Sequence, residues 1–167
     1  MTRYAATTEV STDRSKAEVE RTLVRYGADQ FAYATSPGQA MIGFRLSGRL
    51  YRFILPLPDR QSEEFRLTPN RRTARSDAAG QAAWEQGCRQ RWRALALYIK
   101  AVLEARESGI ISAEDGFLAQ AILPDGSTVG ASLEPQLQQA YANGKMPQLL
   151  SGPLALGDGK PRLEISR

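Results

Sequence analysis

The stretch QFAYATSPGQAMIGFRLSGRLYRFILPLP, residues 30–58, constrains the fold more than any other part of the chain. Aliphatic and aromatic residues alternate along it with polar or small ones, and two short turn sequences, Ser-Pro-Gly and Ser-Gly, divide it into three runs. Alternating runs joined by short turns are typical of antiparallel strands. We therefore predict three antiparallel strands over residues 30–35, 40–46 and 49–57.

A two-residue loop at Ser47 and Gly48 would fix the register of the second and third strands. The predicted cross-strand pairs are Leu46 with Arg49, Phe44 with Tyr51, and Ile42 with Phe53. Alternation then directs five large apolar residues to one face, the predicted core: Ile42, Phe44, Tyr51, Phe53 and Leu55. The opposite face is half apolar and favours a partner or a binding platform, and it consists of Met41, Gly43, Arg45, Leu50, Arg52 and Ile54.

Helical periodicity flanks the sheet on both sides. Ser15 and Glu18 match a capping box, which predicts a helix that starts there and stops at Gly27. A long helix is predicted over residues 78–107, with Gly87 as its one point of interruption. The polar stretch between sheet and helix, residues 59–77, lacks periodicity and is predicted to be an exposed loop. After the long helix we expect a short helix, a Pro-Asp-Gly turn and a second short helix.

These elements predict an α+β fold, in which a three-stranded antiparallel sheet is packed by an N-terminal helix and a long central helix. A small helical and hairpin region follows at the C-terminal side. The predicted domain organisation is a flexible leader over residues 1–14, a single domain over 15–150 and a disordered tail over 151–167.

The long helix has distinct faces. Its apolar stripe is predicted to face the core: Trp84, Cys88, Trp92, Leu95, Ile99, Val102 and Leu103. We therefore interpret Trp92 as a core residue and not as a base-stacking one. Arg89 and Arg93 form a basic flank one turn apart. Small apolar residues line the back of the helix, which favours close packing against a second helix, and together with the half-apolar sheet face they predict a homodimer or a larger homo-oligomer.

Positive charge is concentrated in one part of the chain. Residues 60–93 contain eight arginines and four acidic residues. The difference between them equals the whole net charge of +4. All eight are arginine and none is lysine, which suits planar, bidentate recognition of phosphate or carboxylate. A solvated, arginine-rich surface without a ligand is the alternative interpretation.

Several function classes lack the residues they need. The chain has no histidine and a single cysteine, Cys88, so catalysis by a histidine base is excluded and no internal disulfide forms. We predict no catalytic residues, no metal and no cofactor, and hence no enzyme. The chain has no apolar run of the roughly 18 residues that a membrane span needs and no signal-peptide-like start, so we expect a cytoplasmic protein without a membrane partner.

Five segments together resemble a group of small, uncharacterised proteins encoded by bacteriophages and prophages. The segments are RYGADQFAY, GRLYRFILPLPD, CRQRWRALALYIKAVLEA, FLAQAILPDGSTVG and GKMPQLL, and the likeness covers residues 15–150. The resemblance implies a genetic context, because phage genes of this kind often sit among replication and recombination genes. It implies a host-cell cytoplasmic location and assigns no activity or site residues.

The function we predict is binding of nucleic acid, preferably single-stranded DNA, through the phosphate backbone in replication, recombination or annealing. A flexible basic arm that leads into a basic helix flank carries this prediction. The predicted phosphate-binding residues are Arg71, Arg72, Arg75, Arg89 and Arg93, with Arg45 and Arg52 as a second strip beside Tyr33. The alternative is a protein-interaction module whose arginines meet an acidic surface of a host protein complex.

Overall fold

The predicted sheet forms with the predicted register. The computed structural model describes residues 8–70 and 73–144. Its antiparallel sheet has the order β1 (Gln30–Ser36), β2 (Gln39–Leu46) and β3 (Arg49–Pro56). The β2–β3 pairs Leu46–Arg49, Phe44–Tyr51 and Ile42–Phe53 all match the prediction. Ser47 and Gly48 have φ angles of 52° and 77°, and a two-residue hairpin with positive φ at both positions is the type that follows the natural twist of the strands.

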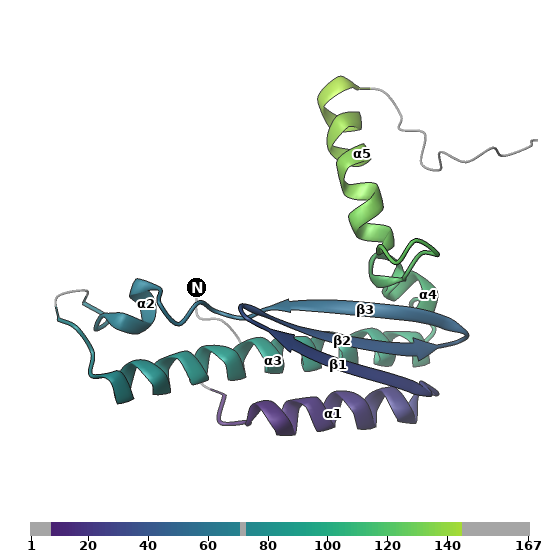
Figure 1. Ribbon diagram of the computed structural model, residues 1–167. Coiled ribbons are helices and arrows are strands. Elements are labelled where there is room, and N and C mark those ends of the chain that lie inside the picture. The colour runs from purple at the N-terminus through teal and green to yellow at the C-terminus, as the bar shows by residue number, and fades with distance from the viewer. Residues whose placement is uncertain (1–7, 71–72, 145–167) are drawn as a thin grey trace, which may run out of the picture. The chain divides into compact units, whose positions relative to one another are not determined.

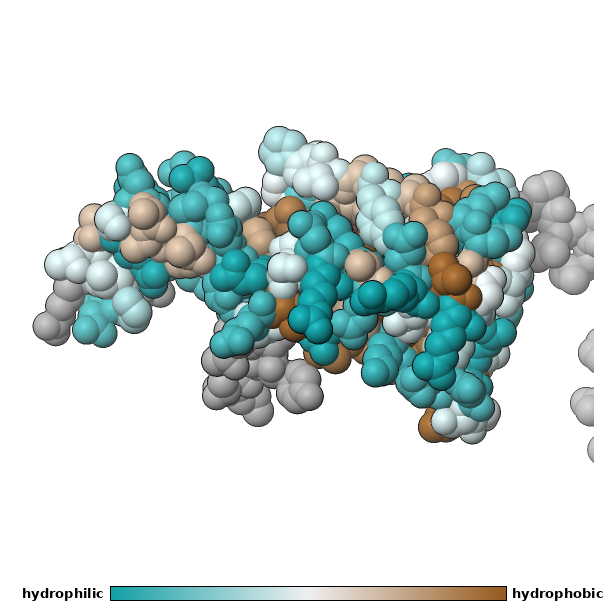
Figure 2. Space-filling view, turned by 90° about the horizontal axis from the view of Figure 1, so that it is seen from below, coloured by the Kyte–Doolittle hydropathy of each residue, from teal (hydrophilic) through white to brown (hydrophobic). Residues whose placement is uncertain are grey.

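Two helices lie side by side under one face of this sheet (Figure 1): α1 (Thr12–Arg25) and α3 (Asp77–Glu107). α1 buries Val19 and Leu23 there, and α3 buries Trp92, Ile99 and Leu103. Seen from the side of α1 and α3, the surface is mostly hydrophilic (Figure 2), so both helices present polar side chains to solvent. The α+β fold class and the core stripe of the long helix are therefore confirmed.

An aromatic cluster joins the sheet to the segment after α3. That segment contains α4 (Ala113–Gly116) and the 3₁₀ helix η1 (Leu118–Gln120) in place of the single short helix predicted there. Between them, Phe117 is fully buried. The Phe117 ring centroid lies 5.7 Å from those of Phe44 and Tyr51 and 5.8 Å from that of Phe53. The break between the two short helices is what turns Phe117 into the core.

α1 begins earlier than the sequence pattern indicated. Its N-cap is Ser11, whose Oγ accepts a hydrogen bond from the Arg14 N–H at 3.2 Å. Ser15, predicted to be the cap, lies within α1 and is fully buried. The capping-box prediction is wrong because Ser15 is on the same face as Val19 and Leu23, and residues 12–14 of the predicted leader are helical.

The polar stretch before α3 is structured where it is described. It contains α2 (Glu63–Arg66), and Phe65 is 4% exposed. Phe65 reaches α3 at Gly87, where a Cβ atom would lie 3.1 Å from the Phe65 Cζ. Gly87 thus leaves room for the Phe65 ring, and α3 continues through Gly87 without interruption. Most described residues of the stretch are exposed, as predicted, but the stretch is not wholly irregular, because α2 forms within it and Phe65 anchors it to α3.

The C-terminal part of the described chain consists of a turn and a helix. The Pro-Asp-Gly turn is present, with a φ of 82° at Gly126. α5 (Val129–Asn143) starts before the predicted helix, with Pro135 inside it, because Thr128 Oγ1 accepts the Ala131 N–H at 3.3 Å. The chain divides into two units, 1–131 and 132–167, and the boundary falls within α5. The tail predicted over 151–167 lies outside the described residues.

Gly116→Ala is expected to lower the free energy of unfolding by about 1–3 kcal/mol, because it overpacks a tight contact. A Cβ atom at Gly116 would overlap Val102 Cγ1 and lie 2.9 Å from Ile111 Cδ1. Urea unfolding followed by circular dichroism measures the change. Val102→Ala removes the overlapping methyl groups. In a chain that carries Val102→Ala, Gly116→Ala should therefore lower the free energy of unfolding by less than it does in the native chain. An unchanged midpoint for Gly116→Ala would contradict this description of the contact.

Candidate anion-binding site

Three arginines line one hollow beside the first turn of α3. The hollow measures about 480 Å³ and lies between α2, the segment that precedes α2, and the start of α3. Its cationic lining is Arg60, Arg66 and Arg75, and among the described residues its one acidic lining residue is Asp77. Within that part of the chain the hollow therefore carries an excess of positive charge.

Hydrogen bonds of the loop hold Arg75 in place. The Thr68 N–H donates to the carbonyl of Thr73 at 2.9 Å, and the Arg75 N–H donates to the carbonyl of Arg66 at 2.8 Å. The Arg75 side chain adds a third bond, from its Nε–H to the Leu67 carbonyl at 2.7 Å. Arg75 is thus oriented by its own loop, which brings it to the same hollow as Arg66.

Arg60 and Arg66 differ from Arg75 in being exposed. In the part of the chain that the structure describes, neither forms an ion pair with a carboxylate. A guanidinium group presents several N–H donors in a planar fork that matches phosphate or carboxylate oxygens. The two side chains can therefore direct these donors at an external anion without first breaking an ion pair to a described residue.

The N-terminus of α3 adds a second source of positive potential. Ser76 caps the helix by accepting the Ala79 N–H at 3.3 Å, and both Ser76 and Gly80 line the hollow. The first turn of a helix leaves backbone N–H groups unpaired and carries a partial positive charge. The negative charge of Asp77 offsets part of that positive charge, but the three arginines leave the lining positive. The hollow is suited to an anion such as a phosphate group.

Of the predicted phosphate-binding residues that the structure describes, one lies at this hollow. It is Arg75, whereas Arg71 and Arg72 fall outside the described residues. Arg60 and Arg66 belong to the arginine-rich stretch of the sequence but are not among the predicted phosphate-binding residues. The signal that would have found them is Phe65, the one aromatic residue in the polar stretch 59–77, because its burial against α3 brings its neighbours to the start of that helix.

Arg89 and Arg93 lie farther along α3 and are engaged with side chains of the protein. The Arg89 Nε–H donates to Gln86 Oε1 at 2.9 Å, and its Nη1 is 4.0 Å from Glu85 Oε2. Arg93 Nη1 lies 2.5 Å from Glu18 Oε2, with 25% of the arginine side chain exposed. Arg93 therefore links α3 to α1, and the structure does not bring it to the hollow.

Arg45 and Arg52 share the outer face of the sheet, as predicted, and both are engaged. Arg45 binds both carboxylate oxygens of Asp29, at 2.8 and 2.5 Å. Arg52 Nη2 donates to the carbonyl of Gly126 at 2.9 Å. Tyr33 is paired with Ile42 and so lies on the core side of the sheet, opposite to both arginines. The strip that was predicted to combine the three is not assembled.

Cys88 does not have the environment of a nucleophile. Its side chain is 8% exposed, and burial raises the pKa of the thiol, which keeps it neutral at pH 7. Within the described residues, no three of the ligand-bearing side chains His, Cys, Asp and Glu come together where they could hold a metal ion. No described helix has both the length and the apolar character needed to cross a membrane.

Comparison with protein-family models, with curated proteins and with solved structures finds no match to this chain.

The Arg45–Asp29 pair gives a prediction about pH. The hydrogen bonds that Arg45 donates to the Asp29 carboxylate lower the pKa of Asp29 below the ordinary value of 3.8. A carboxyl group whose pKa is lowered by folding contributes stability above its unfolded pKa, and this contribution is lost as the pH falls through the folded pKa. Arg45→Gln should therefore destabilise the protein at pH 7, and the difference from the native chain should shrink in acid.

Urea unfolding at several pH values between neutrality and acid measures this difference. Arg21→Gln is the matched control, because Arg21 is exposed and forms no ion pair with any described carboxylate. It should change stability little at any pH. A loss for Arg45→Gln that stays constant from neutral to acid pH would show that the Asp29 carboxylate is not the partner responsible.

Proposed function

We propose that this protein binds nucleic acid, preferably single-stranded DNA, through the phosphate backbone. The observation that carries the proposal is the convergence of Arg60, Arg66 and Arg75 on one hollow at the positive end of α3. Neutralising phosphates with basic side chains releases counterions from the nucleic acid, and this supplies most of the affinity of binding that does not depend on sequence. A role in replication, recombination or annealing is part of the proposal and rests on the phage-protein resemblance.

An acidic protein surface is the alternative ligand for the same arginines. A guanidinium fork pairs with carboxylate as well as with phosphate, so a module that adapts or inhibits a host protein complex would use the same residues. Nucleic-acid binding has a defined salt dependence, because counterions are released from the strand. Nucleic-acid affinity falls with the logarithm of salt concentration at a slope of about 0.7 per phosphate contacted on a single strand.

Arg60→Ala combined with Arg66→Ala should weaken binding to a labelled single strand and lower the slope of log affinity against log salt by about 1.4, if each arginine contacts one phosphate. Fluorescence anisotropy over a salt series measures both quantities. The control is Arg14→Ala with Arg21→Ala, which removes the same charge from exposed positions of α1. The control should leave the slope nearly unchanged.

Equal losses for the two double variants would mean that overall charge, and not the hollow, determines affinity. Absence of binding to any strand at low salt would contradict the nucleic-acid proposal. The acidic-protein alternative then becomes the better account of the arginines.

Self-association is a further part of the proposal, and the edge of the sheet supports it. Among the described residues, β1 pairs only with β2, so its other edge has free backbone N–H and C=O groups. The seven residues of β1 include no charge and no proline, which are the usual protections of an exposed edge strand. Two copies aligned antiparallel about Tyr33 would oppose Ala32 of one to Ala34 of the other, with no like charges facing each other.

Ala34→Lys should therefore shift the protein from dimer to monomer in sedimentation velocity measurements, because a charge on the edge strand opposes strand pairing. Ala101→Lys tests the other expected interface, the back of α3 that is lined by small apolar residues, among them the exposed Ala101, and should leave the dimer intact. If Ala101→Lys dissociates the dimer and Ala34→Lys does not, the helix back is the interface instead. A native chain that is monomeric at all concentrations would contradict self-association altogether.

A further inference from the structure

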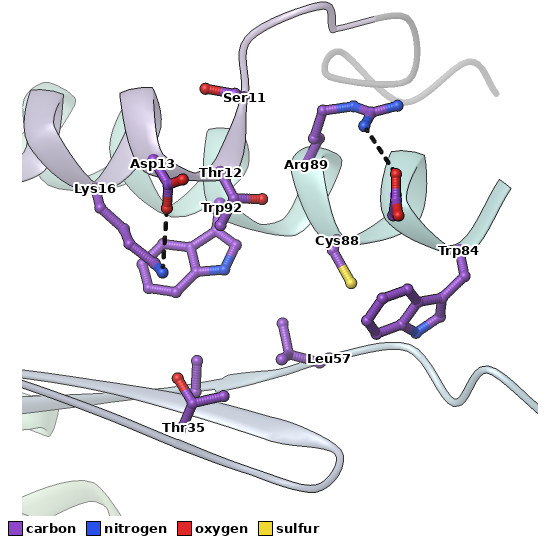
Figure 3. Close-up of a pocket in the computed structure, with 12 residues that line it drawn as sticks. Ser11, Thr12, Asp13, Lys16, Thr35, Leu57, Trp84, Cys88, Arg89 and Trp92 are labelled. Atoms are coloured by element: carbon purple, nitrogen blue, oxygen red, sulfur yellow. Dashed lines mark ion pairs between the residues drawn. The ribbon is translucent and has the colours of Figure 1, made fainter. Parts of the chain in front are cut away.

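A second hollow lies along α3, and both tryptophans of the chain line it. It measures about 350 Å³ and is bounded by the start of α1, by α3 and by the end of the sheet. In Figure 3 the thiol of Cys88 lies between the indoles of Trp84 and Trp92, and Leu57 faces it across the cavity. The volume is at the lower end of the range of about 300–1,000 Å³ found for small-ligand pockets.

The two indole rings have different roles at this hollow. Trp92 is 2% exposed, and the Lys16 ammonium lies 5.0 Å from its ring centroid, so it belongs to the core and one of its faces is occupied. Trp84 is partly exposed, and its Nε1–H donates to the carbonyl of Pro58 at 2.8 Å. That hydrogen bond fixes the orientation of the Trp84 ring. Trp84 is therefore a rigid aromatic wall that a planar ligand can contact.

Two cationic side chains, Lys16 and Arg89, lie at the rim of the hollow, and each forms a long ion pair. The Lys16 Nζ is 3.6 Å from Asp13 Oδ1, and Arg89 Nη1 is 4.0 Å from Glu85 Oε2. Ion pairs at these separations near the surface contribute little stability, so an anionic ligand can take either cation from its partner at low cost. An aromatic wall with cations at the rim matches a planar ring that bears a negative charge.

Both hollows lie along α3. Gly80 and Gln81 line the first, while Trp84 and Cys88 line the second. With about 3.6 residues per turn, Gln81, Trp84 and Cys88 fall on one side of the helix. The rise from Gly80 to Cys88 is roughly 12 Å at about 1.5 Å per residue, a distance that a strand of a few nucleotides covers.

We propose that the second hollow takes one unpaired base of a nucleic-acid strand whose phosphates lie at the arginine-lined hollow. The base stacks on Trp84, and Arg89 or Lys16 contacts the adjoining phosphate. This inference rests on the proposed function and makes it more specific, because the bases of a duplex are stacked on one another and cannot enter. Single strands are bound in this way elsewhere, by a basic groove combined with aromatic stacking surfaces.

The two tryptophans make the experiment direct. Because no other tryptophan is present, emission excited selectively from tryptophan, and not from the tyrosines, reports on this hollow alone. Titrating the protein with unlabelled oligothymidylate should quench the emission, and the quenching should follow the binding curve obtained by anisotropy with a labelled strand. Trp92→Phe, which leaves Trp84 as the one reporter, should retain the quenching.

Trp84→Ala should weaken binding of the single strand roughly tenfold, within the range found for the loss of one base stacked on an aromatic side chain. It should leave the weaker binding of a blunt duplex unchanged, because duplex binding uses the phosphates only. Cys88→Phe fills the hollow without removing an arginine and should give the same selective loss. Circular dichroism and thermal unfolding establish that each variant is folded before its affinity is compared.

The outcomes separate this inference from the proposed function. If the single strand binds with a steep salt dependence but leaves the emission unchanged, and a folded Trp84→Ala or Cys88→Phe binds it as well as the native chain does, the base pocket is wrong and phosphate binding stands. If Trp84→Ala weakens single strand and duplex equally, the base pocket is again wrong. If no strand binds at low salt, both proposals fail.

Discussion

The contact between Phe44 and its aromatic neighbours is the interaction on which the rest of the structure depends. The Phe44 ring centroid lies 5.5 Å from that of Tyr51, 6.1 Å from that of Phe53 and 5.7 Å from that of Phe117. The first two neighbours come from the adjacent strand and the third from the segment after α3, so one cluster fixes both the sheet and the C-terminal side of unit 1–131. A slip of one residue between β2 and β3 would move Tyr51 and Phe53 to the outer face. The Ser47-Gly48 turn prevents that slip, since its length admits one register.

The parts of the fold that were predictable are those set by neighbours in sequence. The β2–β3 register follows from a two-residue turn and a period of two, and the core stripe of α3 follows from its helical period. The wrong predictions concern side chains whose partners are distant. Ser15 matches a cap locally but is buried beside Val19, and Phe65 is buried only because Gly87, more than twenty residues later, leaves space for its ring. The residues next to each of these side chains in the sequence do not identify its partner.

At the candidate site, too, some features can be predicted from the sequence and others depend on distant partners. The concentration of arginine between residues 60 and 93 is visible in the sequence, and the residues that line the hollow fall within this stretch. Which arginines face outward is not visible there. Arg93 meets Glu18 of another helix and Arg45 meets Asp29 of another strand end, so acidic residues outside the basic stretch engage them. Arg60 and Arg66 have no such ion-pair partner in the described residues, and this distinction depends on tertiary structure alone.

The burial of Phe65 also has a consequence for how the arginine-lined hollow comes apart. Among the described residues from 59 to 76 it is the one buried side chain, so most of the apolar attachment of this stretch to α3 is one ring. Burying a phenylalanine stabilises by about 1.5–3 kcal/mol, well below the roughly 5–15 kcal/mol of a whole domain. We therefore expect the stretch to open locally while the aromatic cluster stays folded. On warming, the amide protons of α2 will exchange with solvent before those of β2, and the hollow will lose its shape before the protein unfolds.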